Sequence, residues 1–116
     1  MTDEREIIEV SDEVIAVLAV NATLKTDGVA CMAGGIYNAL SKNLLGKELV
    51  GKGIKVAQYE GSVEIDVNII VKYGHKIPSV AWDIQENVKK EINTMTGLRV
   101  AAVNIHVQGV EHDDQK

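Results

Sequence analysis

Apolar and polar side chains alternate from Val63 to Lys72, and this pattern constrains the fold more than any other feature of the chain. Its apolar members are Val63, Ile65, Val67, Ile69 and Val71. Because successive side chains of a β-strand point to opposite faces, the alternation predicts a strand with one face in the core and the other toward water.

A shorter strand is predicted from Ile54 to Tyr59, directly before the long one. Residues 60–62 (Glu-Gly-Ser) are typical of a tight turn, so we expect the two strands to form an antiparallel hairpin. The chain returns to a strand pattern from Leu98 to Val110. The alternation there slips near Ala101 and Ala102, which a β-bulge or a change in burial would explain.

Two helices are predicted beside these strands. The first begins after Ser11, a good N-terminal cap, and runs to about Leu24. Its apolar positions are wider than one sheet face needs, which favours a second contact. The second begins near Pro78 and ends at Gly97. Its apolar residues recur at steps of three or four and are Ile77, Ala81, Ile84, Val88, Ile92 and Met95.

The stretch between Gly28 and Gly53 carries the weakest pattern. A strand over residues 28–33, a short helix from Ile36 to Leu45 and a loop over residues 46–53 fit it. Because glycines and lysines interrupt this stretch, we expect a mobile segment there, above all from Ser41 to Lys52.

The length of 116 residues and the hydrophobic content of 46% fit a single domain over residues 1–116, with its core over about residues 7–111. No apolar run could cross a membrane and the charged start is no export signal, so we expect a cytoplasmic protein without direct membrane insertion. The net charge of -5 opposes binding to phosphate backbones, and 3% aromatic residues cannot stack many bases. Nucleic acid is therefore not an expected partner.

The sequence carries no pattern for a cofactor, a metal ion or catalysis. The glycine-rich stretches match neither nucleotide-binding motif in order, and the three histidines lack the spacing of metal ligands. His106 is expected on the polar side of the last strand. Cys31, the single cysteine, has no adjacent histidine or lysine to activate it, and we expect it to be buried.

The strongest functional signal is for binding another protein. Trp82 lies one step from the apolar stripe of the second helix, at the edge of the buried face, where a tryptophan either anchors an interface or covers the core. Tyr73 and His75 lie at the turn before that helix, where side chains are exposed. We therefore predict Trp82, Tyr73 and His75 as partner-binding residues, with a plain surface histidine as the alternative for His75.

An enzyme is a weaker alternative. Glu64 and Asp66 share the wet face of the long strand, and paired carboxylates can act in acid–base chemistry, here together with His75. Such an enzyme requires the three side chains to converge in a pocket. Alternating acids on an exposed strand are otherwise simply solubilising.

Several stretches, in matching order, resemble the alkaline-shock and general-stress envelope proteins of Gram-positive bacteria. They are residues 8–15 (IEVSDEVI), 28–30 (GVA), 53–56 (GIKV), 69–74 (IIVKYG) and 103–110 (VNIHVQGV). The resemblance covers about residues 7–111, and its last stretch is the most specific. It implies a small α+β domain, a stress-linked role, no established catalytic residues, and association with the cell envelope through self-assembly or a membrane-anchored partner. It also implies, for some relatives, a link to fatty-acid precursor synthesis.

Together these patterns predict an α+β domain with a mainly antiparallel sheet of about four strands and two main helices packed on one face. We expect a non-enzymatic binding and assembly protein of the cell-envelope stress response, a homo-oligomer or a partner of a membrane-anchored protein at the inner face of the membrane. The alternative is a regulatory module that binds a soluble metabolic enzyme of fatty-acid precursor synthesis.

Overall fold

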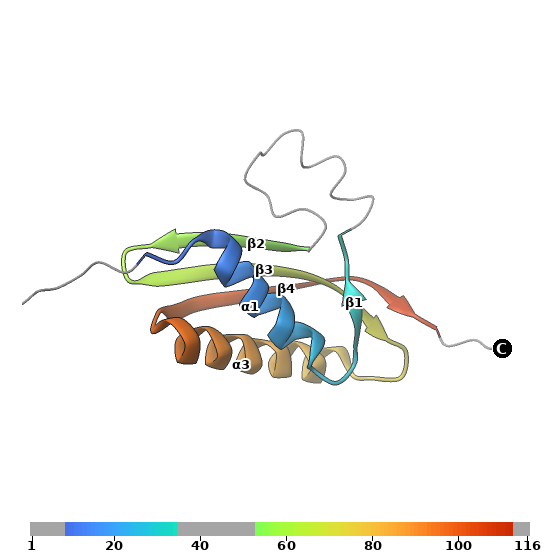
Figure 1. The fold of residues 1–116 in the computed structure, drawn as a ribbon. Coiled ribbons are helices and arrows are strands. Elements are labelled where there is room, and N and C mark those ends of the chain that lie inside the picture. The colour runs from blue at the N-terminus through green and yellow to red at the C-terminus, as the bar shows by residue number, and fades with distance from the viewer. Residues whose placement is uncertain (1–8, 35–52, 113–116) are drawn as a thin grey trace, which may run out of the picture.

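The computed structural model describes residues 9–34 and 53–112, which form a four-stranded sheet with two helices (Figure 1). In chain order the elements are α1 (Asp12–Leu24), β1 (Val29–Met32), β2 (Ile54–Tyr59), β3 (Ser62–Lys72), α3 (Ile77–Thr96) and β4 (Arg99–Glu111). The predicted α+β class is confirmed. The predictions of a short helix from Ile36 to Leu45 and of a mobile segment from Ser41 to Lys52 lie outside the described residues.

β3 is the centre of the sheet, because each of the other strands pairs with it. β1 and β2 are antiparallel to β3 and follow one another along one of its edges, β1 beside residues 69–71 and β2 beside residues 62–67. β4 pairs with the other edge along its full length and is parallel. The parallel pairing follows from α3, which returns the chain to the end of the sheet where β3 begins.

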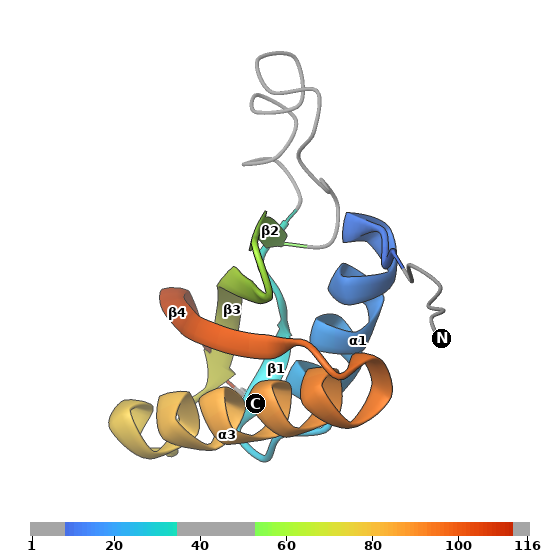
Figure 2. The same ribbon diagram turned by 90° about the vertical axis from the view of Figure 1, so that its left-hand side faces the viewer.

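Both helices cover the same face of the sheet (Figure 2). On that face β3 presents its alternate apolar residues from Val63 to Val71, all of them buried. α3 adds a row at steps of four, formed by Val80, Ile84, Val88 and Ile92. α1 adds a row of one large and three small residues, Ile15, Ala16, Ala19 and Ala22. These three sets make one continuous core.

The predicted helix ends are confirmed. Ser11 precedes α1, and its Oγ accepts a hydrogen bond from the backbone N–H of Val14 at 3.2 Å. Pro78 lies in the first turn of α3. Gly97 ends α3 with φ of 80°, a left-handed conformation that favours glycine.

The predicted buried stripe of α3 is partly wrong. Ile84, Val88 and Ile92 are buried as expected, but Val80 takes the place of Ile77 and Ala81, and Met95 is largely exposed. The side chains of α3 that face the sheet lie at steps of four, starting from Val80. Val80 packs against the turn at Gly28, where a Cβ atom would lie 2.6 Å from Val80 Cγ2.

Cys31 is exposed, so its predicted burial is wrong. A shift in the β1–β3 register after Val29 brings Cys31 opposite Ile70, on the face without helices. Another shift, between Val63 and Glu64 of β3, leaves Ala101 of β4 without a partner, which favours the bulge among the two explanations for the slip there.

Candidate functional site

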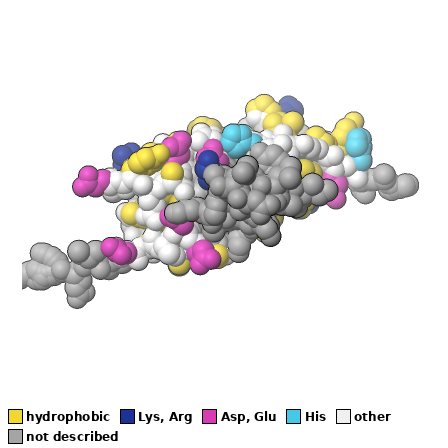
Figure 3. Space-filling model, turned by 90° about the horizontal axis from the view of Figure 1, so that it is seen from above, with side chains coloured by type: hydrophobic (Ala, Val, Ile, Leu, Met, Phe, Trp, Pro, Cys, Tyr) yellow, Lys and Arg dark blue, Asp and Glu magenta, His cyan; other side chains and the backbone are white. Residues whose placement is uncertain are grey.

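A row of polar side chains crosses the open face of the sheet. Asn104 of β4 donates from Nδ2 to Glu64 Oε2 and to Asp66 Oδ1, at 3.1 Å each. His106 Nε2 lies 3.1 Å from Asp66 Oδ1, and Gln108 donates to Asn68 at 2.8 Å. Figure 3 shows a histidine beside acidic side chains along the upper rim of the molecule. The row therefore satisfies much of its own hydrogen bonding.

The three residues of the enzyme hypothesis do not converge. Glu64 and Asp66 belong to the polar row, whereas His75 follows the far end of β3. Asp66 and Lys72 alone are separated by about 20 Å of extended strand. The histidine beside Asp66 is His106, on the polar side of β4 as the sequence predicted. Within residues 9–34 and 53–112, no group of three or more His, Cys, Asp or Glu side chains could hold a metal ion.

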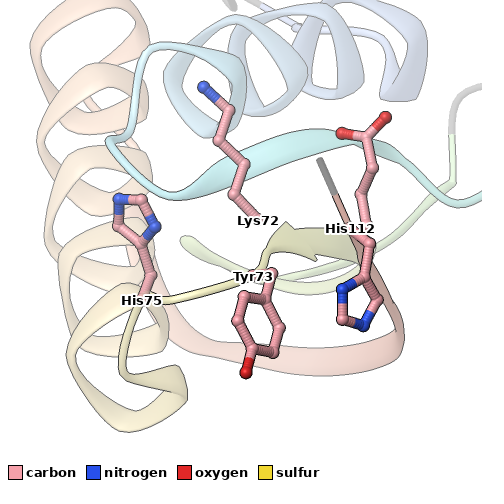
Figure 4. Close-up of a pocket in the computed structure, with 5 residues that line it drawn as sticks. Lys72, Tyr73, His75 and His112 are labelled. Carbon is pink, nitrogen blue, oxygen red and sulfur yellow. The ribbon is translucent and has the colours of Figure 1, made fainter. Parts of the chain in front are cut away.

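Tyr73 and His75 line one shallow depression of about 360 Å³ at the end of the sheet (Figure 4). Lys72, Glu111 and His112 complete its lining. The Tyr73 ring is exposed and stacks on His112, with ring centroids 4.5 Å apart. The backbone N–H of Tyr73 donates to the Glu111 carbonyl at 2.9 Å, which extends the β3–β4 ladder to this point.

His75 has a packing contact that the sequence did not indicate. Its Nε2 lies 3.9 Å from Asp27 Oδ2, and a Cβ atom on Gly28 would be 3.1 Å from its ring. Gly28 has φ of 97°, so the turn between α1 and β1 depends on a glycine there. His75 thus packs on the α1–β1 turn and also lines the depression.

Trp82 is 61% exposed, so its predicted place at the edge of the buried face is wrong. It lies two residues after Val80 and two before Ile84, about 200° from each around the helix. It therefore points away from the sheet and does not cover the core. It is not among the residues lining the depression, so the three predicted binding residues do not form one site.

The outward face of α1 carries a second apolar row. Val14, Val17 and Leu24 are 44% to 49% exposed, and Asn21 lies between them. We name these four residues the outer α1 stripe. Since the buried row of α1 lies on the opposite side, the helix is apolar on both faces. The sequence analysis predicted an apolar pattern of this width on the first helix. In the structure α1 lies at the outside of the molecule (Figure 2).

The polar row on the open face was missed at the sequence level. Its signal was present, because polar residues recur at every second position in both β3 and β4. Only the parallel pairing of these two strands brings Asp66 opposite Asn104 and Asn68 opposite His106.

Comparison with known proteins gives matches along most of the chain. The family model of alkaline-shock protein 23, described as having a cell envelope-related function, matches residues 1–112. The chain is 38% identical over 106 residues to YqhY of Bacillus subtilis, covering 91% of this chain and 78% of YqhY. It is 42% identical over 105 residues to YloU of the same organism, covering 89% and 87%.

A more distant relative carries a stress-related name. A homologue of the stress response regulator Gls24 from Streptococcus pyogenes is 29% identical over 104 residues, and the match covers 90% of this chain but 58% of that protein. Among solved structures, the C-terminal domain of MamM has a TM-score of 0.53 at 14% identity, covering 87% of this chain and 100% of that domain. At this identity the likeness shows the fold alone.

Proposed function

This chain belongs to the alkaline-shock protein 23 family, whose function is related to the cell envelope and to stress, and we propose that it is a non-enzymatic binding and assembly protein. It acts through self-association or through a membrane-anchored protein partner. The described part of the chain contains no helix that could span a membrane.

The outer α1 stripe is the observation that carries this proposal. A helix that is apolar on both faces is expected where both faces are covered, and the sheet covers only one. Exposed apolar rows of this kind mark protein contacts more often than catalysis. The open face of the sheet supports the same view, because its carboxylates Glu64 and Asp66 accept hydrogen bonds from Asn104 of the neighbouring strand.

Tyr73 and Trp82 are the candidate anchors of the contact with another protein. Both side chains are exposed, and exposed aromatic residues commonly supply interface hot spots. They lie at separate places, Tyr73 at the strand end and Trp82 on α3, so each can be tested alone.

Affinity capture from a detergent-solubilised native lysate tests the proposal. With immobilised wild-type protein we expect membrane proteins to be recovered, and Trp82→Ala or Tyr73→Ala to reduce their recovery several-fold. Met95→Ala is the matched control, because Met95 is equally exposed on α3. Recovery of a soluble enzyme of lipid-precursor synthesis in place of membrane proteins would favour a regulatory module. Unchanged recovery and oligomer size in both aromatic variants would exclude these anchors.

A further inference from the structure

We propose that α1 packs against α1 of a second copy in an antiparallel, two-fold symmetric dimer, with the outer α1 stripe of each copy covering the other. This inference rests on the proposed self-association and specifies its surface, orientation and register.

The spacing of the stripe fits a helix-to-helix contact. Its four residues follow one another at steps of three, four and three, which is the pattern of a coiled-coil seam. The seam lies opposite the buried row of α1, so it can be covered without disturbing the core. Half-buried Leu18 and Val20 flank it and widen the contact.

The charges of α1 select the antiparallel orientation. Asp12 and Glu13 occupy its first turn, and Lys25 is its C-terminal cap. Parallel helices would bring like charges together at both ends. Antiparallel helices bring the acidic start of one copy beside Lys25 of the partner subunit, and their helix dipoles are also opposed favourably.

One register satisfies both the charges and the stripe. When Glu13 faces the partner's Lys25, Val14 faces the partner's Leu24 and Val17 faces the partner's Asn21. A slip of one turn in one direction leaves Leu24 opposite residue 10, before the partner's helix begins. A slip in the other direction places the partner's Lys25 against Val17, which desolvates a charge on an apolar side chain.

The expected dimer is weak. α1 has 13 residues, or about 20 Å of helix, which gives a contact at the lower end of specific interfaces. We therefore expect a dissociation constant on the order of micromolar, with dimer formation that depends on concentration.

Cysteine cross-linking tests the register in a Cys31→Ser background, because the native Cys31 is exposed. We expect Val14→Cys combined with Leu24→Cys to give a disulfide-linked dimer under mild oxidation. The two positions are about 15 Å apart within one helix, so they cannot bond to each other in one chain. Each single variant is the matched control and should stay uncross-linked. Dimers from a single variant would contradict the antiparallel orientation.

Charge reversal gives an independent test by sedimentation. Glu13→Lys or Lys25→Glu alone should lower the association constant about tenfold, since each dimer loses two attractive pairs. The double variant Glu13→Lys with Lys25→Glu should recover most of the lost association constant, because the attractive pairs form again with their charges exchanged. Both substitutions oppose the dipole of α1, so recovery cannot arise from a more stable helix. An association constant of the double variant as low as that of the single variants would overturn the proposed register.

The outcomes separate this inference from the function on which it rests. Oligomers that form with concentration but give no cross-link between positions 14 and 24 would remove the α1 pairing and leave self-association through another surface. A protein that remains monomeric at all concentrations would remove self-association itself, and the α1 pairing with it.

Discussion

The two helices cover the same face of one sheet, yet they differ in what remains on their other side. α3 buries one row at steps of four, and most of its other residues are polar, with Ile77, Trp82 and Met95 as the exposed apolar exceptions. α1 buries Ile15 and three alanines and exposes a second apolar row of similar length. The sheet can cover only one side of each helix. The exposed apolar residues of α1 form one row, whereas those of α3 lie apart from one another. An apolar pattern that extends around more of a helix than the sheet can cover favours a contact with another protein.

The largest effect is expected from truncating the buried row of α3. Ile84→Ala removes a fully buried side chain at the centre of the core and should lower the free energy of unfolding by about 2–5 kcal/mol. Urea unfolding measures this loss. Met95→Ala, on the exposed side of α3, should change stability by less than about 0.5 kcal/mol. Similar losses in both variants would mean that the two sides of α3 are not distinct.

A smaller loss is expected at the turn where the end of α1 meets the start of α3. Gly28→Ala places a Cβ atom 2.6 Å from Val80 Cγ2 at a positive φ, and should lower the free energy of unfolding by about 1–3 kcal/mol. Gly74→Ala is the control, since it has the same φ of 97° but open space around it. An equal loss at both glycines, measured by thermal unfolding, would attribute the cost to φ alone.

The polar link between the helices should contribute less. Asn87 of α3 donates from Nδ2 to Thr26 Oγ1 at 2.8 Å, and this hydroxyl in turn donates to the Ala22 carbonyl at 2.9 Å. Thr26→Val keeps the shape but removes both bonds, so we expect a loss of about 1 kcal/mol. A double-mutant cycle with Asn87→Ala, followed by urea unfolding, isolates the link. A coupling energy near zero would show that packing alone joins α1 to α3.

The smallest effect on stability is expected on the outer α1 stripe. Val17→Gln should change the free energy of unfolding of the monomer by less than about 0.5 kcal/mol, because the side chain is already half exposed. The same variant should lower the association constant by about tenfold. Met95→Gln on α3 should leave association unchanged. Equal effects from the two substitutions would remove the difference between the helices.

Much of the fold could be predicted from the sequence, because its strongest patterns are local. The alternation in β3 and the caps at Ser11 and Gly97 depend on neighbouring residues, and these predictions are confirmed. The buried position of Val80 could not be predicted, since it depends on contact with Gly28 from a distant turn. The predicted burial of Cys31 was wrong for a similar reason, because a shift in the β1–β3 register turns this side chain to the open face of the sheet.

The candidate surfaces were less predictable than the fold. The sequence indicated a broad apolar α1, but only the packed structure separates its buried row from the exposed stripe. The exposure of Trp82 was misjudged because a step of one residue from Ala81 turns the side chain by about 100° around the helix, and Ala81 is itself only half-buried. The polar row depends on the parallel pairing of β3 with β4, which neither strand reveals alone.

The central claim is that this protein functions through assembly, with α1 incomplete in a single copy. Light scattering coupled to size-exclusion chromatography, over a hundredfold range of protein concentration, tests it most directly. We expect the mass to rise from that of a 12.6 kDa monomer toward that of a dimer or larger assembly, and the rise to be reduced by Val17→Gln. A constant monomer mass over the full range would contradict the claim.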